Sequence, residues 1–114
     1  MLHPKGSLPE SVAEHFRGGE GAVRLIDLAA GNKPANVRVC SEMVLEKGCS
    51  IGYHTHEGDS EIIYILSGNG ICNDNGLDVC VGAGDTLIAY DGDAHSLRNE
   101  GEVPLRYIAV IVKA

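Results

Sequence analysis

The sequence predicts an all-β domain, a sandwich or barrel of about nine short strands with one short helix before it. Turn residues recur at regular intervals, and the clearest case is Asn75-Gly76 between two short apolar runs, a strong hairpin signal. Apolar and polar residues alternate over residues 36–45 with the period of two that is typical of a half-buried strand. The 15 glycines among 114 residues suit a fold with many tight turns.

Residues 1–21 are expected to form an N-terminal arm that contains the helix. Ser7 is a suitable N-cap, Glu10 stands three residues after it, and a proline lies between them. Two helical turns over residues 10–17 would then end at Gly18-Gly19.

The remaining residues, 22–114, form the barrel domain in this prediction. Its first strands are expected at residues 22–28 and 36–45, with a loop at residues 31–34 between them. The later strands are expected directly after Gly48 and at residues 61–67, 71–74, 77–81, 86–89, 94–99 and 104–112.

The stretch 61–67, EIIYILS, is apolar on both faces after its first residue, whereas a half-solvated strand would alternate. If Glu61 points inward, Ile63 and Ile65 share its face. The opposite face then needs a cover, which the N-terminal segment or a second subunit could supply; its residues are Ile62, Tyr64 and Leu66. We expect a homodimer.

Two histidines and a glutamate after Gly48 suggest a metal site. His54 and His56 lie two residues apart in a predicted strand, so their side chains share a face and can reach one ion. Glu61 follows a turn and is expected to open the next strand beside the first. A second stretch, residues 84–99, adds His95. This donor set suits one divalent transition-metal ion per chain, Mn, Fe, Ni, Co or Zn. The alternative is a polar sheet surface that holds no metal.

The same two stretches resemble the cupin superfamily. The family's first motif, Gly, five residues, His, one, His, three or four, Glu, six, Gly, is matched by Gly48, His54, His56, Glu61 and Gly68. The second motif is matched by Gly84, Gly92, His95 and Asn99, with Tyr90 where the family usually has proline. The resemblance implies a double-stranded β-helix, or jelly roll, of the small single-domain RmlC-like type, with the three histidines and Glu61 as metal ligands. The glycines are expected to serve turn geometry, and Asn99 a structural role.

The resemblance leaves the function open among classes. The resemblance to cupins with this ligand set implies an activity of the dioxygenase, lyase, isomerase or decarboxylase type. The substrate would then be a small molecule that reacts at the metal. The alternative is a non-catalytic metabolite-binding cupin with the metal as ligand anchor, and a third hypothesis is a structural metal in an interaction module. Whether the chain is an enzyme is undecided by the sequence. The candidate acid, base or anion-binding residues, each more ordinarily explained by packing or exposure, are Tyr53, Tyr64, Tyr90, Tyr107, Arg38 and Arg106.

Two cupin activities are disfavoured. The best-known oxalate decarboxylases are two-domain proteins, whereas this chain predicts one domain. Cysteine-dioxygenase sites usually lack the glutamate that Glu61 provides.

Charge and composition exclude further classes. The net charge of −7 and the lack of a Lys/Arg cluster make nucleic acid an unexpected partner. No apolar run approaches the ~20 residues of a membrane span, and the N-terminus has no apolar signal core, so a cytoplasmic protein is expected. The four cysteines are expected to be reduced, half-buried strand residues, with a cross-strand contact between Cys72 and Cys80 as an open alternative.

Overall fold

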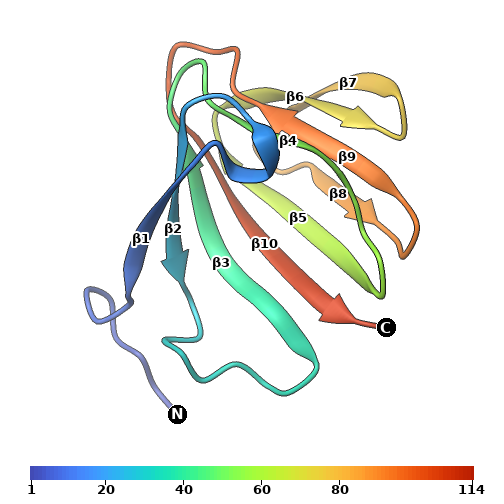
Figure 1. Ribbon diagram of the computed structural model, residues 1–114. Coiled ribbons are helices and arrows are strands. Elements are labelled where there is room, and N and C mark those ends of the chain that lie inside the picture. Colours follow the sequence, from blue (N-terminus) through green and yellow to red (C-terminus); the bar gives the residue numbers. More distant parts are fainter.

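Two antiparallel sheets that face each other form the molecule, and together they make a double-stranded β-helix (Figure 1). The computed structural model describes residues 1–114. The larger sheet has the order β1-β2-β3-β10-β5-β8 and the smaller one β4-β9-β6-β7. The strands are β1 (Glu10–Glu14), β2 (Ala22–Asp27), β3 (Val37–Leu45), β4 (Ser50–Thr55), β5 (Asp59–Ser67), β6 (Asn69–Asp74), β7 (Leu77–Gly82), β8 (Thr86–Ala89), β9 (Ala94–Arg98) and β10 (Leu105–Lys113). The all-β prediction is therefore confirmed.

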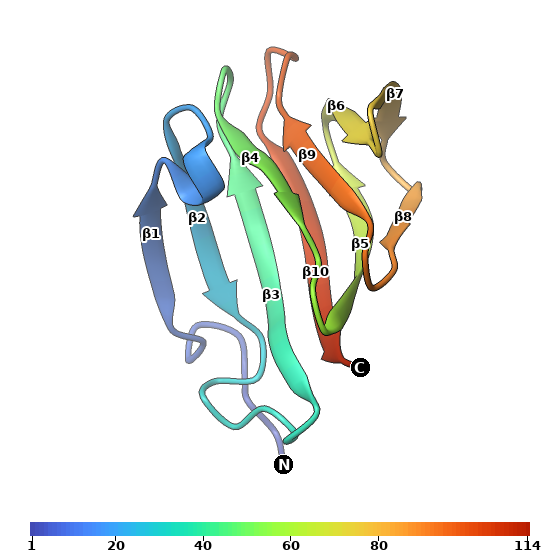
Figure 2. The same ribbon diagram turned by 45° about the vertical axis from the view of Figure 1, so that its right-hand side comes forward.

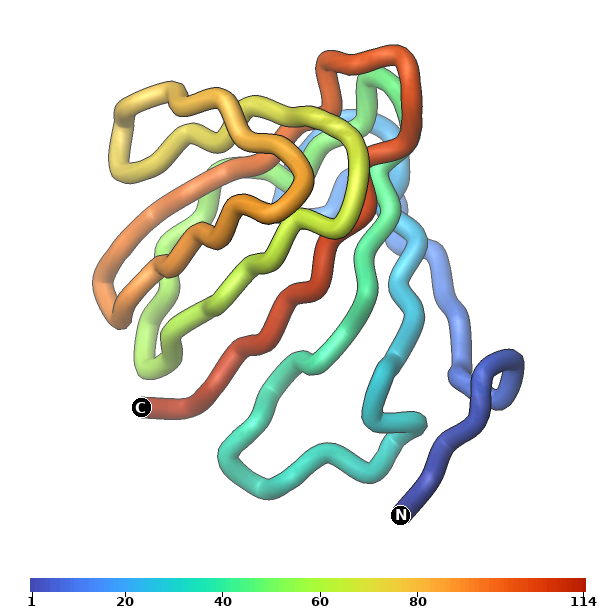
Figure 3. Tube along the Cα trace, turned by 180° about the vertical axis from the view of Figure 1, so that it is seen from behind, coloured from blue at the N-terminus to red at the C-terminus, as the bar shows by residue number.

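The C-terminal strand lies at the centre of the larger sheet. β10 pairs with β3 on one side and with β5 on the other, and Figure 3 shows these three strands side by side from behind. Figure 2 shows β4 and β9 of the smaller sheet in front of β10 and β5. The buried core lies between the two layers, with Leu45, Ile65 and Leu105 each 0% exposed.

The inward face predicted for β5 is confirmed, but within one chain the strand is not buried on both sides as its apolar sequence suggested. Ile63 and Ile65 share the buried face of Glu61 and are 4% and 0% exposed. The opposite face is exposed, with Ile62 at 45%, Tyr64 at 44% and Leu66 at 39%. The N-terminal segment therefore does not cover this face, because its strand β1 pairs with β2 at the far edge of the sheet.

The predicted N-terminal helix is wrong. Residues 10–14 form the edge strand β1, which pairs with β2 in the register Val12↔Arg24, and only a 3-10 turn, η1 (Phe16–Gly18), follows. So short a segment gains little from helical hydrogen bonds on its own, whereas pairing with β2 satisfies backbone groups along the free edge of that strand. Tertiary pairing therefore overrides the local capping signal.

The turn positions of the motif agree with the prediction. The glycines of the two motifs have positive backbone φ angles, which are +80° at Gly48, +85° at Gly68, +89° at Gly84 and +96° at Gly92. At Gly68 a Cβ atom would also lie 2.4 Å from the Pro104 carbonyl oxygen, so a side chain has no room there.

Asn99 has the structural role that the sequence suggested. Its side chain is 1% exposed and donates hydrogen bonds of 2.9 Å to the carbonyl oxygens of Leu45 and Val103. It therefore fixes the turn between β9 and β10 and makes no contact with the histidines.

The cysteines are all free thiols, and Cys72 and Cys80 form no disulfide. Cys40 and Cys49 are half-buried and Cys72 is buried, whereas Cys80 is exposed, so the burial prediction is wrong for Cys80. Burial raises the pKa of the Cys72 thiol to about 11, which keeps it protonated at neutral pH. No helix in the structure is both long and apolar enough to cross a lipid bilayer.

Candidate metal centre

The four residues singled out in the sequence converge on one point between the two sheets. His54 lies on β4 and His95 opposite it on β9, in the direct register pair His54↔His95. His56 follows the end of β4, and Glu61 is the third residue of β5. Their ligand-type atoms all lie within 4.8 Å of one another, and all but His54 are buried. The cluster fits the three-histidine, one-glutamate pattern.

The route by which Glu61 reaches the cluster differs from the prediction. β4 and β5 are not neighbours, because β4 belongs to the smaller sheet and β5 to the larger one. The turn between them crosses from one layer to the other and is held by the backbone hydrogen bonds His56 N–Asp93 O (2.8 Å) and Gly92 N–His56 O (2.7 Å). The centre therefore joins two facing sheets rather than two adjacent strands.

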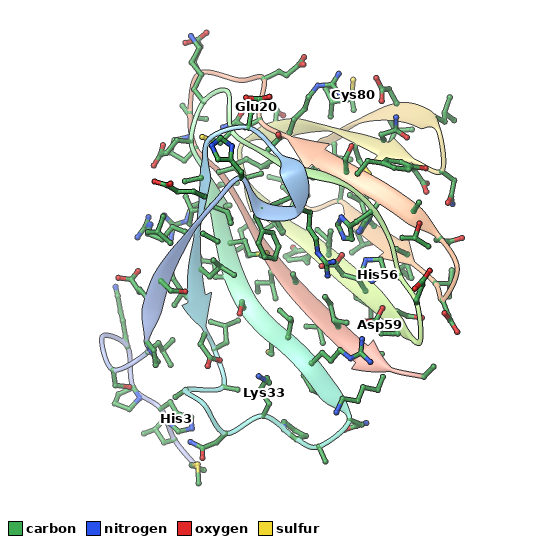
Figure 4. The ribbon with its side chains drawn as sticks, in the orientation of Figure 1. His3, Glu20, Lys33, His56, Asp59 and Cys80 are labelled. Atoms are coloured by element: carbon green, nitrogen blue, oxygen red, sulfur yellow. The ribbon has the colours of Figure 1, made fainter.

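Hydrogen bonds at the outer nitrogens orient two of the imidazoles. His54 Nδ1 lies 2.7 Å from the Gly52 carbonyl oxygen, which can only accept, so this nitrogen carries the proton. His56 Nδ1 likewise donates to Asp59 Oδ1 at 2.8 Å, and Arg38 Nη1 donates to Asp59 Oδ2 at 2.7 Å. In their neutral forms both rings therefore present the lone pair of Nε2 to the centre, as a metal ligand must. Figure 4 shows His56 and Asp59 close together below the turn η1.

The distances inside the cluster suit one ion. His56 Nε2 lies 3.1 Å from Glu61 Oε1 and 2.9 Å from His95 Nε2, and His95 Nε2 lies 2.8 Å from Glu61 Oε1. Two ligand atoms at right angles on an ion with bonds of about 2.1 Å are about 3.0 Å apart. In a neutral His56 with its proton on Nδ1, Nε2 and the Glu61 oxygen are both acceptors, so a cation between them would satisfy both. The residues therefore fit a metal ion.

The protonation of His54 also suits a ligand. Burial lowers the pKa of His54 below its ordinary 6.5, the hydrogen bond to the Gly52 carbonyl opposes this, and electrostatic interactions with His95, Arg17 and His56 lower the pKa further. The neutral imidazole, which is the metal-binding form, is therefore favoured at neutral pH.

A cavity of about 90 Å³ opens beside the cluster, between the two sheets. Most of its wall is apolar, and His54, Glu61 and His95 line one side. Three further polar residues line it, Arg17, Ser96 and Tyr107. Pockets for drug-sized ligands occupy about 300–1,000 Å³, so this cavity suits a much smaller molecule.

The tyrosines and arginines predicted as acid, base or anion-binding candidates lie in different places, and Tyr107 alone among them lines the cavity. Tyr107 lines the cavity and is 2% exposed, and burial together with the charge of Glu61 raises the pKa of its hydroxyl. Tyr53 is 53% exposed, which agrees with the prediction that it points away from His54. Tyr64 and Tyr90 are exposed and Arg106 pairs with Glu42, whereas Arg38 pairs with Asp59 and so supports His56 from behind.

The prediction missed Arg17, which lines the cavity from the turn η1. Nothing in the local sequence connects residue 17 to a motif that begins at Gly48. Only the packing of η1 against β4 brings the two together, as Figure 1 shows.

Comparisons with known proteins agree with the fold. The cupin domain family matches residues 41–111. An oxalate-binding protein of Thermotoga maritima is 41% identical over 105 residues, 91% of this chain and 86% of that protein. The crystal structure of a predicted oxalate decarboxylase from Thermotoga maritima matches with a TM-score of 0.90 and 36% identity over 100% of both chains. A cupin protein of Bacteroides fragilis, at 21% identity, matches in fold with a TM-score of 0.70 over 100% of this chain and 82% of its own. The chain therefore belongs to the cupin family.

Proposed function

We propose that the chain holds one divalent transition-metal ion on His54, His56, Glu61 and His95 and binds a small carboxylate ligand there. The observation that carries this proposal is the hydrogen bonding of the outer nitrogens of His54 and His56, which aims two Nε2 lone pairs at one point beside Glu61. When bound, the ion supplies a Lewis-acidic charge that attracts and polarises a carboxylate.

The ligand class follows from the cavity and from the relatives. A cavity of about 90 Å³ admits a compact ligand, and Glu61 is the only carboxylate in its lining, so an anion meets little repulsion. The name of the Thermotoga maritima relative says that it binds oxalate. The two-domain argument against oxalate does not apply, because this single domain covers 100% of a chain described as a predicted oxalate decarboxylase.

The lining of the cavity favours binding over turnover. A general base must accept a proton near neutral pH, and Glu61, the one carboxylate, already contacts both His56 and His95. Tyr107 favours a second candidate function, a metal-dependent reaction on a small acid. Its raised pKa keeps the hydroxyl protonated, so Tyr107 can donate a hydrogen bond to a bound substrate but cannot serve as a base.

Metal analysis and calorimetry test the proposal together. The protein is purified without chelator or nickel resin as wild type, as His54→Ala and as His3→Ala, a matched control in the N-terminal arm (Figure 4). We expect near-stoichiometric metal in the wild type and in His3→Ala and a large loss in His54→Ala. Titration with oxalate should then give binding only to the metal-loaded forms. Metal-free wild type that takes up no added Mn²⁺ or Zn²⁺ would refute the proposal.

Product analysis separates the two candidate functions. Oxalate is incubated with the metal-loaded wild type and with Tyr107→Phe, and carbon dioxide and formate are measured. Unchanged oxalate supports a binding protein, whereas turnover that falls in Tyr107→Phe supports the enzyme.

We also propose that a second copy of the chain covers the outer face of β5, β8 and β10. Register pairs place apolar residues side by side on this face, Ile62↔Ile88, Ile62↔Val110 and Tyr64↔Ile108. Such a patch with an ion pair at its edge, Arg106–Glu42, suits an isologous contact across a two-fold axis. Light scattering during gel filtration should give a dimer for the wild type and a monomer for Ile62→Lys, and a monomeric wild type contradicts this.

A further inference from the structure

Arg17 is the one arginine of the chain without a carboxylate partner. The chain has five arginines and 16 acidic residues, so enough carboxylates exist for every arginine to form a pair. The other four form the pairs Arg24–Glu10, Arg38–Asp59, Arg98–Glu100 and Arg106–Glu42. The arginine without a carboxylate partner is therefore the one that lines the cavity beside His54 and His95, and its guanidinium carbon lies 5.9 Å from the centre of the Phe16 ring.

The turn that carries Arg17 is held in a strained conformation. Arg17 has φ +55° and ψ 29°, a left-handed conformation that costs a non-glycine residue free energy and is found at ligand-binding clamps when the surroundings enforce it. Two glycines allow the close packing, because a Cβ atom at Gly52 would lie 2.0 Å from the Arg17 carbonyl oxygen and one at Gly19 would lie 2.1 Å from the Ser50 carbonyl oxygen.

Two hydrogen bonds fasten the same turn to the site strand. Glu20 N donates to Ser50 Oγ at 2.8 Å, and Ser50 N donates to the Glu20 carbonyl oxygen at 2.9 Å. The strand that begins at Ser50 is β4, which carries His54. The backbone of Arg17 is therefore held against the strand that carries His54, and its exposed side chain lines the cavity.

The charges of the site set the charge of the ligand. With neutral histidines, a divalent ion, the Glu61 carboxylate and the Arg17 guanidinium leave an excess of two positive charges. A dianion neutralises this excess, whereas a monoanion neutralises half of it. A guanidinium also presents paired donors that match a carboxylate in two-point contact.

We propose that Arg17 binds the outer carboxylate of a small dianionic dicarboxylate and thereby makes the site prefer such ligands to monocarboxylates. This inference rests on the proposed function, because it requires the ion on the four ligands. It adds a specificity residue from the N-terminal turn to a site otherwise built from the two motifs.

Calorimetry on the full chain loaded with Mn²⁺ tests the inference, with oxalate as the dianion and glycolate as a chelating monoanion. The variants are Arg17→Gln, the matched control Arg24→Gln on the exposed Arg24–Glu10 pair, and Arg17→Asn. Asparagine adopts the left-handed conformation readily, so it removes the guanidinium without added backbone strain. Circular dichroism and metal content confirm the folded, loaded state of each protein.

We expect both Arg17 variants to bind oxalate about tenfold to a hundredfold more weakly than the wild type, with metal content unchanged. Glycolate affinity should change by less than about threefold, and Arg24→Gln should match the wild type for both ligands. Wild-type affinity for oxalate in Arg17→Gln and Arg17→Asn overturns the inference and leaves the proposed function standing. An equal loss for glycolate and oxalate also overturns it. A wild type that binds no metal or no oxalate refutes the proposed function and this inference with it.

Discussion

Replacing Asp59 by asparagine should weaken metal binding about tenfold to a hundredfold, although Asp59 is not itself a ligand. Its two oxygens serve two donors, His56 Nδ1 at 2.8 Å and Arg38 Nη1 at 2.7 Å, and the residue is only 7% exposed. An asparagine offers one oxygen, so one of these donors would face an amide N–H instead of an acceptor.

The size of the affinity loss depends on how much more Asp59 stabilises the metal-bound protein than the metal-free protein. A hydrogen bond to a charged group contributes about 1.5–3 kcal/mol, but a loss that is equal in both states would not change the affinity. A bound cation makes the Nδ1–H of His56 a stronger donor, so Asp59 stabilises the metal-bound state more. A tenfold to hundredfold weaker affinity corresponds to about 1.4–2.7 kcal/mol of this difference.

The assay is a titration of Mn²⁺ or Zn²⁺ in competition with a chelating dye. Asp85→Asn is the matched control, because Asp85 Oδ2 accepts from Gly82 N at 2.8 Å in an exposed turn and the same charge is removed. Equal dissociation constants for the wild type and Asp59→Asn would refute the reasoning, and so would an equal loss in Asp85→Asn.

Three further predictions concern stability. Gly52→Ala should destabilise the protein by about 1–3 kcal/mol in urea unfolding, because its Cβ would lie 2.0 Å from the Arg17 carbonyl oxygen; Gly101→Ala, with 3.4 Å to the nearest atom, is the control. The stability of the metal-free protein should fall as the pH drops below 6.5, since the lowered pKa of His54 makes the folded chain resist a proton that the unfolded chain accepts. His54→Gln should reduce that slope, and an unchanged slope contradicts the assignment. Metal at 100 times its dissociation constant should stabilise the protein by about 2.7 kcal/mol, seen as a lower melting temperature after chelation; no change on chelation would contradict metal binding to the folded state.

The strands of the barrel were largely predictable from local patterns. Alternation with period two and turn residues such as Asn75-Gly76 reflect rules that act within a few residues, so they appear in the sequence directly. The N-terminal segment was predicted wrongly for the same reason. Its capping signal is local, whereas the free edge of β2 that captures residues 10–14 is a property of the assembled sheet.

The candidate site also has a part that the sequence predicted and a part that only the tertiary structure decided. The spacing of His54, His56 and Glu61, together with His95, determined by itself which side chains could form a metal site, because ligand chemistry and motif spacing are written in residue types. The tertiary structure alone decided that Glu61 faces the histidines from the opposite sheet and that Arg17 lines the cavity beside them. Both contacts join residues from different sheets or distant segments, and such contacts depend on how the layers pack, which no local sequence pattern encodes.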